Sequence, residues 1–188
     1  MITPDDVLEF WFEGDPSAWR ELWFKSNATF DTACGRFADA LRDAKQGAYD
    51  HWTTTPRGTL ALIILLDQFS RNLHRGSPEA FAADAKARAL AREAVAAGSD
   101  RMLGPIERVF VYLPFEHSEN LADQDQSVRL FATLRDALGD ETVGYAERRR
   151  EAMRRFGRFP HRNAVLGRES TPDELAWLAA RDANRAGS

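Results

Sequence analysis

The stretch LALIILLDQFSRNLHRG, residues 60–76, decides how this chain folds. Residues 60–66 are apolar all round, which is typical of a helix that is buried on every side. This apolar run is far shorter than the roughly 20 residues that a membrane-spanning helix needs. Charged residues then follow at Asp67, Arg71 and Arg75, spaced i, i+4, i+8 along one face. The stretch therefore predicts a central helix with a polar stripe at its far end.

The polar stripe has a structural and a functional interpretation. A buried carboxylate or guanidinium needs a partner, so the stripe must face either other polar side chains or a ligand. The structural interpretation is an ion pair between Asp67 and Arg71 at a helix end that leaves the core. The functional interpretation adds Gln68 and makes the stripe one wall of a ligand site.

Signals for helix starts and ends fill the rest of the chain and predict an all-α fold. TPDD at 3–6, SPE at 77–79 and TPDE at 171–174 each place a capping hydroxyl before a proline and acidic residues. Glycines 47, 76, 98, 139 and 157 fall where C-terminal caps are expected. Alternating strand patterns are missing. We expect helices near residues 4–13, 16–26, 29–46, 57–75, 78–97, 105–119, 121–138, 141–156 and 172–184.

Length, charge and cysteine content narrow the class of protein. With 188 residues the chain is expected to form a single all-helical domain, 1–188, whose last few residues are loose. A net charge of −4 argues against nucleic-acid binding or attachment to a membrane surface. The acidic N-terminus has no signal-peptide pattern, so we expect a cytoplasmic protein. The lone Cys34 excludes an internal disulfide. The oligomeric state stays open.

A second polar stretch is PIERVFVYLPFEHSENLADQDQS, residues 105–127. Helical spacing puts His117 on the face of the apolar residues Ile106, Val109, Phe110 and Leu113. A histidine on such a face is more often a core residue than a catalytic one. Glu116 and Glu119 lie close to it, however, and Pro114 is expected to kink or end the helix just before them. Both a catalytic and a structural role therefore stay open for His117.

Arginine concentrates in the stretch 144–168. Residues 145–168 hold eight Arg and two Glu, a net charge of +6, so the rest of the chain sums to −10. Arg149 is expected to point inward, between Tyr145 and Met153 on the apolar side of a helix. The neighbouring arginines, Arg148, Arg150, Arg154 and Arg155, are expected to form a solvated face.

The helix of this stretch should break after Gly157, where the sequence reads GRFPHRN. Phe159 is expected to anchor a loop that Pro160 stiffens. The loop then presents the polar residues Arg158, His161, Arg162 and Asn163. An arginine fork suits a carboxylate or a phosphate group.

LALIILLDQFSRNLHRG, VYLPFEHSENLADQDQSVRLF and RFGRFPHRNAVLGRESTPDELAWL together resemble the family catalogued as domain of unknown function family 924. VLEFWFE and FDTACGRFADAL are similar to it as well, so the resemblance covers nearly the whole chain. It implies a right-handed superhelix of antiparallel helix pairs, tetratricopeptide-like, with about eight or nine helices. It supplies no activity, substrate or cofactor. The matching signature positions are Asp67, Gln68, Arg71, Arg75, Glu116, His117, Glu119, Gln124, Arg158, His161, Arg162 and Asn163.

One position departs from the family pattern. Arg149 stands where the family usually has histidine, eight residues or so before the loop string. This replacement weakens any mechanism that requires a histidine there. It adds one more guanidinium to the candidate site.

Three functions fit these residues. We favour binding of a small anionic molecule or a peptide carboxylate. The candidate ligand-binding residues are Gln68, Arg71, Arg75, Glu116, Arg149, Arg158, His161, Arg162 and Asn163. The alternative is a hydrolase with His117, Glu119 and Asp67 as acid–base groups. The third is a tetratricopeptide-like scaffold whose polar network is structural.

The motifs of common enzyme and metal sites give no further guidance. A glycine-rich phosphate loop, a G-x-S-x-G elbow and an H-E-x-x-H pair are all missing from the sequence. The spacing of His117 and Glu119 matches no metal-ligand motif, so we assign no metal site. Whether the protein is an enzyme, and which cofactor it uses, stay open.

Overall fold

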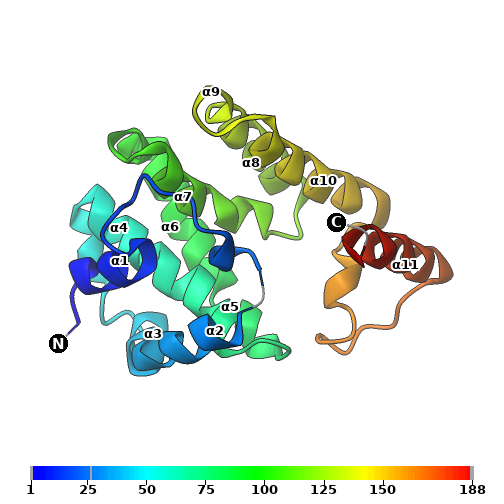
Figure 1. Cartoon of the computed structure of the whole chain (residues 1–188), viewed down its shortest axis with the longest axis horizontal. Helices are drawn as coiled ribbons and strands as arrows, with labels where there is room; N and C mark the ends of the chain where they lie inside the picture. Colours follow the sequence, from blue (N-terminus) through cyan, green and yellow to red (C-terminus); the bar gives the residue numbers. More distant parts are fainter. Residues whose placement is uncertain (1, 26, 187–188) are drawn as a thin grey trace.

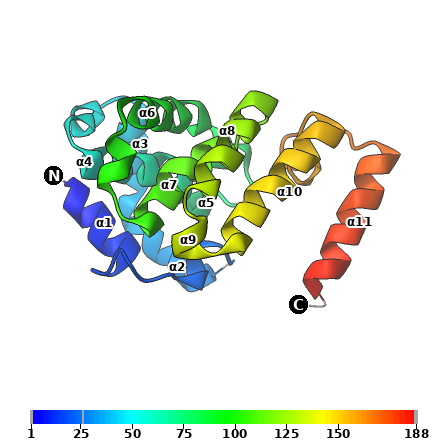
Figure 2. The ribbon, with the colours of Figure 1, turned by 90° about the horizontal axis from the view of Figure 1, so that it is seen from above.

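The computed structural model describes residues 2–25 and 27–186 (Figures 1 and 2). All regular elements in this part of the chain are helical, which confirms the all-α fold class. The α-helices are α1 Pro4–Phe12, α2 Ala28–Cys34, α3 Ala38–Lys45, α4 Pro56–Ile63, α5 Ser70–Leu73, α6 Asp84–Ala97, α7 Pro105–Glu116, α8 Leu121–Ala132, α9 Arg135–Leu138, α10 Asp140–Phe156 and α11 Pro172–Ala186. The right-handed, tetratricopeptide-like superhelix stays a prediction.

Short turns of other helix types connect these helices. The 3-10 turns are Glu21–Trp23, Gly35–Phe37, Asp50–Thr54, Pro78–Phe81, Ser99–Met102 and Pro160–Arg162, and Ile64–Phe69 is π-helical. Four of the expected helices therefore form with an interruption or with a 3-10 first turn. Gly98 and Gly157 end α6 and α10 with φ angles of 69° and 66°, so these caps are confirmed.

The expected helix over 16–26 is wrong. Within its described part the segment makes the single 3-10 turn Glu21–Trp23. The Asp15 carboxylate accepts hydrogen bonds from the backbone N–H and the hydroxyl of Ser17, at 2.9 and 2.6 Å. Such a local turn competes with helix formation. The indole of Trp23 then donates to the carbonyl of Trp11, which folds the segment against α1.

The central helix is confirmed and consists of α4, the π-helical turn and α5. The hydroxyl of Thr55 caps its start by accepting from the N–H of Gly58 at 3.0 Å. All side chains of residues 60–67 are buried. The π-helical turn holds Asp67 and Gln68 in the middle of this buried run. A π-helical turn inside an α-helix is frequently found at functional sites.

The main hydrophobic core extends from α1 to α10 and is rich in aromatic rings. Trp11 packs edge to face on Phe69 and Phe110, with centroid distances of 5.3 and 5.5 Å. Trp19 and Phe24 remain 47% and 45% exposed, and Tyr145 is 52% exposed. The expectation that Tyr145 belongs to the apolar side of its helix is therefore wrong.

The C-terminal part of the chain has a small core of its own. Ala152, Met153 and Phe159 form a separate cluster, against which Trp177 of α11 packs. Figure 2 shows α10 lying beside α8, and α11 standing apart beyond α10. The loop that joins α10 to α11 turns back toward α5 and α7 (Figure 1). This return brings the arginine-rich loop to the polar end of the central helix.

In the described residues, no helix combines the length and apolar character needed to cross a membrane.

Candidate functional site

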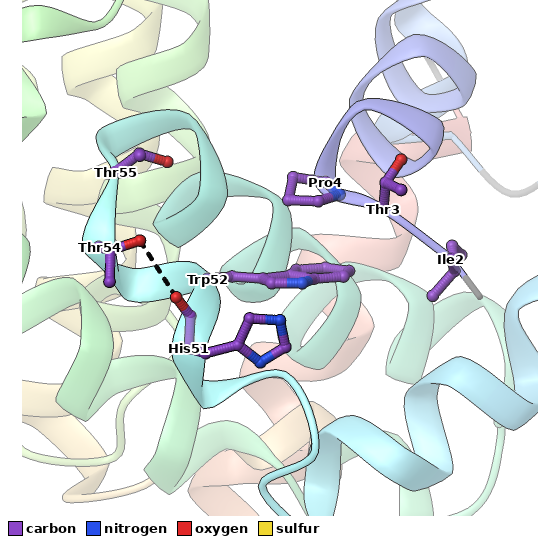
Figure 3. A pocket seen from close by; sticks show the side chains of 7 residues that line it. All are labelled: Ile2, Thr3, Pro4, His51, Trp52, Thr54 and Thr55. Atoms are coloured by element: carbon purple, nitrogen blue, oxygen red, sulfur yellow. Dashed lines mark hydrogen bonds between the residues drawn. The ribbon is translucent and has the colours of Figure 1, made fainter.

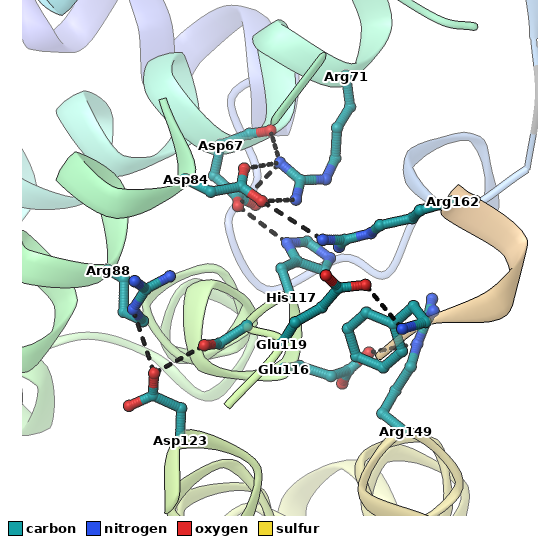
Figure 4. Close-up of polar contacts among 12 residues, drawn as sticks. Asp67, Arg71, Asp84, Arg88, Glu116, His117, Glu119, Asp123, Arg149 and Arg162 are labelled. Carbon is teal, nitrogen blue, oxygen red and sulfur yellow. Dashed lines mark hydrogen bonds and ion pairs between the residues drawn. The ribbon is translucent and has the colours of Figure 1, made fainter. Parts of the chain in front are cut away.

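A polar cluster lies where the central helix, the start of α6, the end of α7, α10 and the arginine-rich loop meet (Figure 4). We use the name polar cluster for Asp67, Arg71, Asp84, Glu116, His117, Arg149, His161 and Arg162. Five chain segments far apart in the sequence contribute to it. Most of the predicted site residues are therefore brought together.

Asp67 and His117 form the centre of the polar cluster. Oδ1 of Asp67 lies 2.9 Å from Nδ1 of His117, and Asp67 is completely buried. Burial opposes ionisation of Asp67, but the positive charge of Arg71 and the bond to His117 hold its pKa below the ordinary value. Burial and the nearby Arg71 lower the pKa of His117. At neutral pH the pair is therefore a carboxylate and a neutral imidazole.

The end of α7 places His117 at this point. The helix continues through Pro114 to Glu116, so the proline does not end it, and His117 is its C-terminal cap. The N–H of His117 donates to the carbonyl of Leu113 at 2.8 Å. The side chain of His117 keeps 12% of its surface exposed. Its imidazole is thus fixed in position and still reachable from solvent.

Arg71 joins Asp67 to Asp84, which begins α6. Its two terminal nitrogens donate to the two Asp84 oxygens at 2.9 and 3.0 Å, and Nη1 also donates to the carbonyl of Asp67 at 2.7 Å. Nη1 lies 3.1 Å from Oδ1 of Asp67 as well. The donors of Arg71 are thus largely used by internal partners.

Glu116, Arg149 and His161 form the second part of the polar cluster. Nε of Arg149 lies 3.5 Å from Oε1 of Glu116, and Nη1 lies 3.2 Å from Nε2 of His161. Burial raises the pKa of Glu116, although Arg149 opposes the shift. Burial and the surrounding arginines lower the pKa of His161 to about 2. Arg149 is half-buried and points inward, as expected from the sequence.

Bonding to Arg149 decides which nitrogen of His161 carries the proton. A guanidinium can only donate, so Nε2 of His161 must accept and the proton of the neutral ring sits on Nδ1. Nδ1 is buried and has no hydrogen-bond partner among the described residues. His161 therefore contributes an unpaired buried donor.

Arg162 is the least satisfied member of the polar cluster. Its side chain is only 8% exposed, yet its guanidinium donates no hydrogen bond to any residue that the structure describes. Nη1 lies 3.8 Å from Oδ2 of Asp84, and the group stacks over the rings of Phe81 and Phe159. Burial and the positive charge of Arg71 lower its pKa to about 10. Nε of Arg162 is a fully buried donor without a partner among the described residues, which is costly and needs an explanation.

Glu119 does not belong to the polar cluster but holds the loop in place beside it. Its oxygens accept two bonds from Arg168, at 2.7 and 2.8 Å, and one from the N–H of Phe159 at 2.7 Å. Burial opposes ionisation of Glu119, but these bonds hold its pKa below the ordinary value. Glu119 thus acts as an anchor for the loop rather than as a free acid–base group.

Three other predicted ligand residues are engaged elsewhere. Arg75 forms a fork on Asp31 at 2.8 and 2.9 Å, away from the polar cluster. Arg158 forms a fork on Glu174 of α11 at 2.7 and 2.8 Å, and the amide of Asn163 donates to the same carboxylate at 3.2 Å. These residues hold helices together. Gln68 donates to Asp67 and supports the carboxylate from behind.

Two important residues were missed by the sequence reasoning. Asp84 is an ordinary acidic residue at a helix start, and nothing in the sequence distinguishes it. Arg168 is one of the eight arginines in residues 145–168 and is not among the candidate site residues, but its two bonds to Glu119 help to hold the loop in place. The one sequence signal for Arg168 was its position in RFGRFPHRNAVLGRESTPDELAWL, one of the stretches that resemble the family.

Two surface hollows lie away from the polar cluster. One of about 400 Å³ is lined by Pro4, His51 and Trp52 (Figure 3). The other, of about 140 Å³, is lined by Leu8, Phe12 and Pro16. Neither includes a residue of the polar cluster. In the described part of the chain, no group of three or more His, Cys, Asp or Glu side chains is placed to hold a metal ion.

Comparisons with known proteins agree with this fold. The model of a family described as bacterial protein of unknown function (DUF924) matches residues 7–182. A solved structure of a protein of unknown function from Agrobacterium tumefaciens is 40% identical, with a TM-score of 0.83 over 93% of this chain and 96% of that chain. A comparison with curated proteins gives no match. The similarity therefore brings a family and a fold, but no reaction.

Proposed function

The chain belongs to the DUF924 family of bacterial proteins, and we propose that it binds a small anionic molecule or a peptide carboxylate at the polar cluster. The observation that supports this proposal most directly is the environment of Arg162. Its guanidinium is almost fully buried and makes no hydrogen bond to a described residue. A carboxylate or a phosphodiester would accept two of its N–H groups at once. We keep a cytoplasmic location as part of the same proposal.

The charge balance of the polar cluster favours a ligand with one negative charge. Three arginines face three carboxylates, because Asp67, Asp84 and Glu116 lie opposite Arg71, Arg149 and Arg162 (Figure 4). Burial favours the neutral form of Glu116. Because burial raises the pKa of Glu116, uptake of a proton by Glu116 when the ligand binds would make the sum +3 − 2 = +1, and a single negative charge would cancel it. A doubly charged anion would leave an uncompensated charge in a buried place.

A structural network is the second candidate, and it is favoured at particular residues. Arg71, Arg75 and Arg158 each form a fork on an internal carboxylate, as expected of ion pairs that fix helix packing. A double-mutant cycle on Asp67 and Arg71 separates the candidates. A large coupling in the free energy of unfolding, together with no bound anion, would favour the structural network.

Thermal unfolding with anions of different charge tests the proposal. Acetate and dimethyl phosphate, at constant ionic strength, should raise the unfolding temperature of the wild type more than sulfate does. A ligand at 100 times its Kd stabilises a protein by about 2.7 kcal/mol. Arg162→Gln should abolish the stabilisation, while Arg75→Gln serves as the matched control and should keep it. Equal responses of the wild type and Arg162→Gln to every anion would refute the proposal.

A further inference from the structure

We infer that Asp67 and His117 form an acid–base pair that hydrolyses an ester of the anion held at Arg162. The inference rests on the proposed function, because the anionic group positions the substrate. The substrate class is a small ester that carries one free carboxylate. Its carboxylate would lie at Arg162, and its ester carbonyl beside His117.

The hydrogen bond to Asp67 fixes the tautomer of His117. An ionised carboxylate can only accept, so the proton of the neutral imidazole must sit on Nδ1, 2.9 Å from Asp67. The lone pair is then on Nε2. A buried carboxylate that orients an imidazole in this way is the arrangement used by hydrolytic enzymes to present a base.

Nε2 of His117 is available to a substrate. It forms no hydrogen bond with any described residue, and it is not among the fully buried polar atoms that lack a partner. A purely structural histidine at 12% exposure would be expected to use both ring nitrogens. In Figure 4, Asp67 connects His117 to Arg71 on one side of the cluster, and Arg162 reaches Asp84 from the other side. Asp84 links the two sides, since it contacts both Arg71 and Arg162.

The reaction uses water as the nucleophile. The one thiol of the chain, Cys34, is buried in the main core, and burial raises its pKa to about 12. No hydroxyl of a described residue is hydrogen-bonded to His117, so no serine or threonine is set up for attack. Water is therefore the nucleophile that Nε2 can activate.

The proposed step is balanced without a cofactor. Nε2 of His117 takes a proton from water, and the hydroxide oxygen forms a bond to the acyl carbon of the ester. The bond between that carbon and the leaving oxygen breaks, and the imidazolium returns its proton to the departing alkoxide. Asp67 keeps its negative charge throughout and stabilises the transient imidazolium. The products are an alcohol and a carboxylic acid, and the acid releases its proton to solvent and becomes the second carboxylate of a dicarboxylate.

Alkylation by bromoacetate tests whether a bound anion lies next to Nε2. In this reaction Nε2 forms a bond to the CH2 carbon, and bromide leaves. We expect bromoacetate to label His117 at least tenfold faster than neutral bromoacetamide does, and acetate to protect it. Arg162→Gln should remove this preference, and His51, an exposed histidine, should show none. Equal labelling by both reagents would refute the proposed function, whereas bound bromoacetate that leaves His117 unlabelled would refute the inference alone.

Hydrolysis of mono(4-nitrophenyl) succinate tests the activity itself. We expect the wild type to release 4-nitrophenol, and His117→Ala to be about 10²–10⁴-fold slower. Asp67→Asn should lower kcat more than it raises KM, because it disturbs the tautomer of His117 directly, whereas Arg162, which holds the carboxylate, is unchanged. Added imidazole should partly restore His117→Ala, and His51→Ala should match the wild type.

Binding measurements on the same variants separate the two hypotheses. His117→Ala that still binds acetate, while it has lost hydrolysis, would support both. A wild type that binds acetate but is no faster than His117→Ala on the ester would refute the inference and leave the proposed function standing. A wild type that binds no anion refutes both.

Discussion

Arg158 and Arg162 lie four residues apart in one loop, yet their surroundings are opposite. Arg158 is 30% exposed and donates three hydrogen bonds, two to Glu174 and one to the carbonyl of Glu169. Arg162 is 8% exposed and donates none to the described residues. A network built only for stability would place its hydrogen bonds where burial makes charge most costly. The difference indicates that the loop has two sides with different purposes.

We call the first side the C-terminal clamp, which consists of Arg158, Asn163, Thr171 and Glu174. Here Glu174 accepts bonds from Arg158, Asn163 and the N–H of Thr171, and so fixes the first turn of α11. The second side is the polar cluster, where Arg162 and His161 each keep a buried donor unpaired. Among the described residues, the clamp leaves one buried acceptor without a partner, the amide oxygen of Asn163, whereas the polar cluster leaves two buried donors, on Arg162 and His161.

The largest expected effect concerns the carboxylate at the centre of the polar cluster. Asp67→Asn removes the buried negative charge that Arg71 and His117 face, and we expect the free energy of unfolding to fall by about 3–5 kcal/mol. Urea denaturation measures this value. Asp39→Asn, at an exposed position, is the control and should change stability by less than about 0.5 kcal/mol. A loss as small as the control's would mean that Asp67 is not the anchor of the cluster.

Weakening the C-terminal clamp should destabilise α11 and leave the main hydrophobic core unaffected. Glu174→Gln weakens the fork on Arg158, and we expect the backbone amides of α11 to lose protection in hydrogen exchange while α4 and α7 keep theirs. The reason is that α11 stands apart from the main core and packs through Trp177 on a small cluster of its own. Asp173→Asn, the neighbouring acidic residue of the same helix turn, is the control. Equal loss of protection in the main core would contradict the division into two sides.

The pH dependence of the free energy of unfolding should also distinguish the polar cluster from the C-terminal clamp. The pKa of His161 is about 2 in the folded protein, below the ordinary value, so the unfolded chain binds more protons between pH 6.5 and 4.5. The stabilisation that the neutral His161 provides is therefore complete above pH 6.5. As the pH falls, this stabilisation is lost, and the free energy of unfolding decreases by up to about 1.4 kcal/mol per pH unit. The groups that face it are Arg149, Arg162, Arg181 and His117.

His161→Gln should reduce this slope in a series of denaturation curves between pH 6.5 and 4.5. Glu116 acts in the opposite direction, because burial raises its pKa and its contribution is lost as the pH rises. Glu116→Gln should therefore steepen the slope. The clamp affects the slope only below about pH 4.5, where its stabilisation is lost, since hydrogen bonds from Arg158 and the N–H of Thr171 hold the pKa of Glu174 at about 2. An unchanged slope in His161→Gln would contradict a neutral buried imidazole.

Local signals explain which parts of the fold the sequence predicts. Caps such as Thr55 and Thr171, and C-terminal glycines such as Gly157, act within a few residues, so most helix bounds follow from the sequence. The prediction of a helix over residues 16–26 is wrong because a turn at Asp15 and Ser17 competes with helix formation. The helix propensities of Asp and Ser include such competition only on average, so they do not mark this particular turn.

The candidate site follows from the sequence only in part, because ion-pair partners are chosen over long distances. The stripe on the central helix and the inward position of Arg149 follow from helical spacing. The forks of Arg158 on Glu174 and of Arg168 on Glu119 depend on packing between elements, the latter across 49 residues of sequence. Asn163 and Arg162 look alike as loop donors, and only the fold sends one to α11 and the other to the cluster.

The smallest expected effect is also the most direct test of the comparison. Arg158→Met removes a saturated ion pair and should lower the unfolding temperature. Arg162→Met removes a buried charge that lacks hydrogen bonds. Without ligand, the free energy of unfolding should change by no more than about 1 kcal/mol, and the unfolding temperature should stay the same or rise. Lost stacking on Phe81 and Phe159 limits the gain, since each such contact is worth about 0.5–2 kcal/mol. Differential scanning calorimetry of the two variants, in a buffer of neutral amines and chloride, gives both values. If both substitutions destabilise the protein equally, Arg162 has structural partners after all, and the buried guanidinium no longer argues for a ligand.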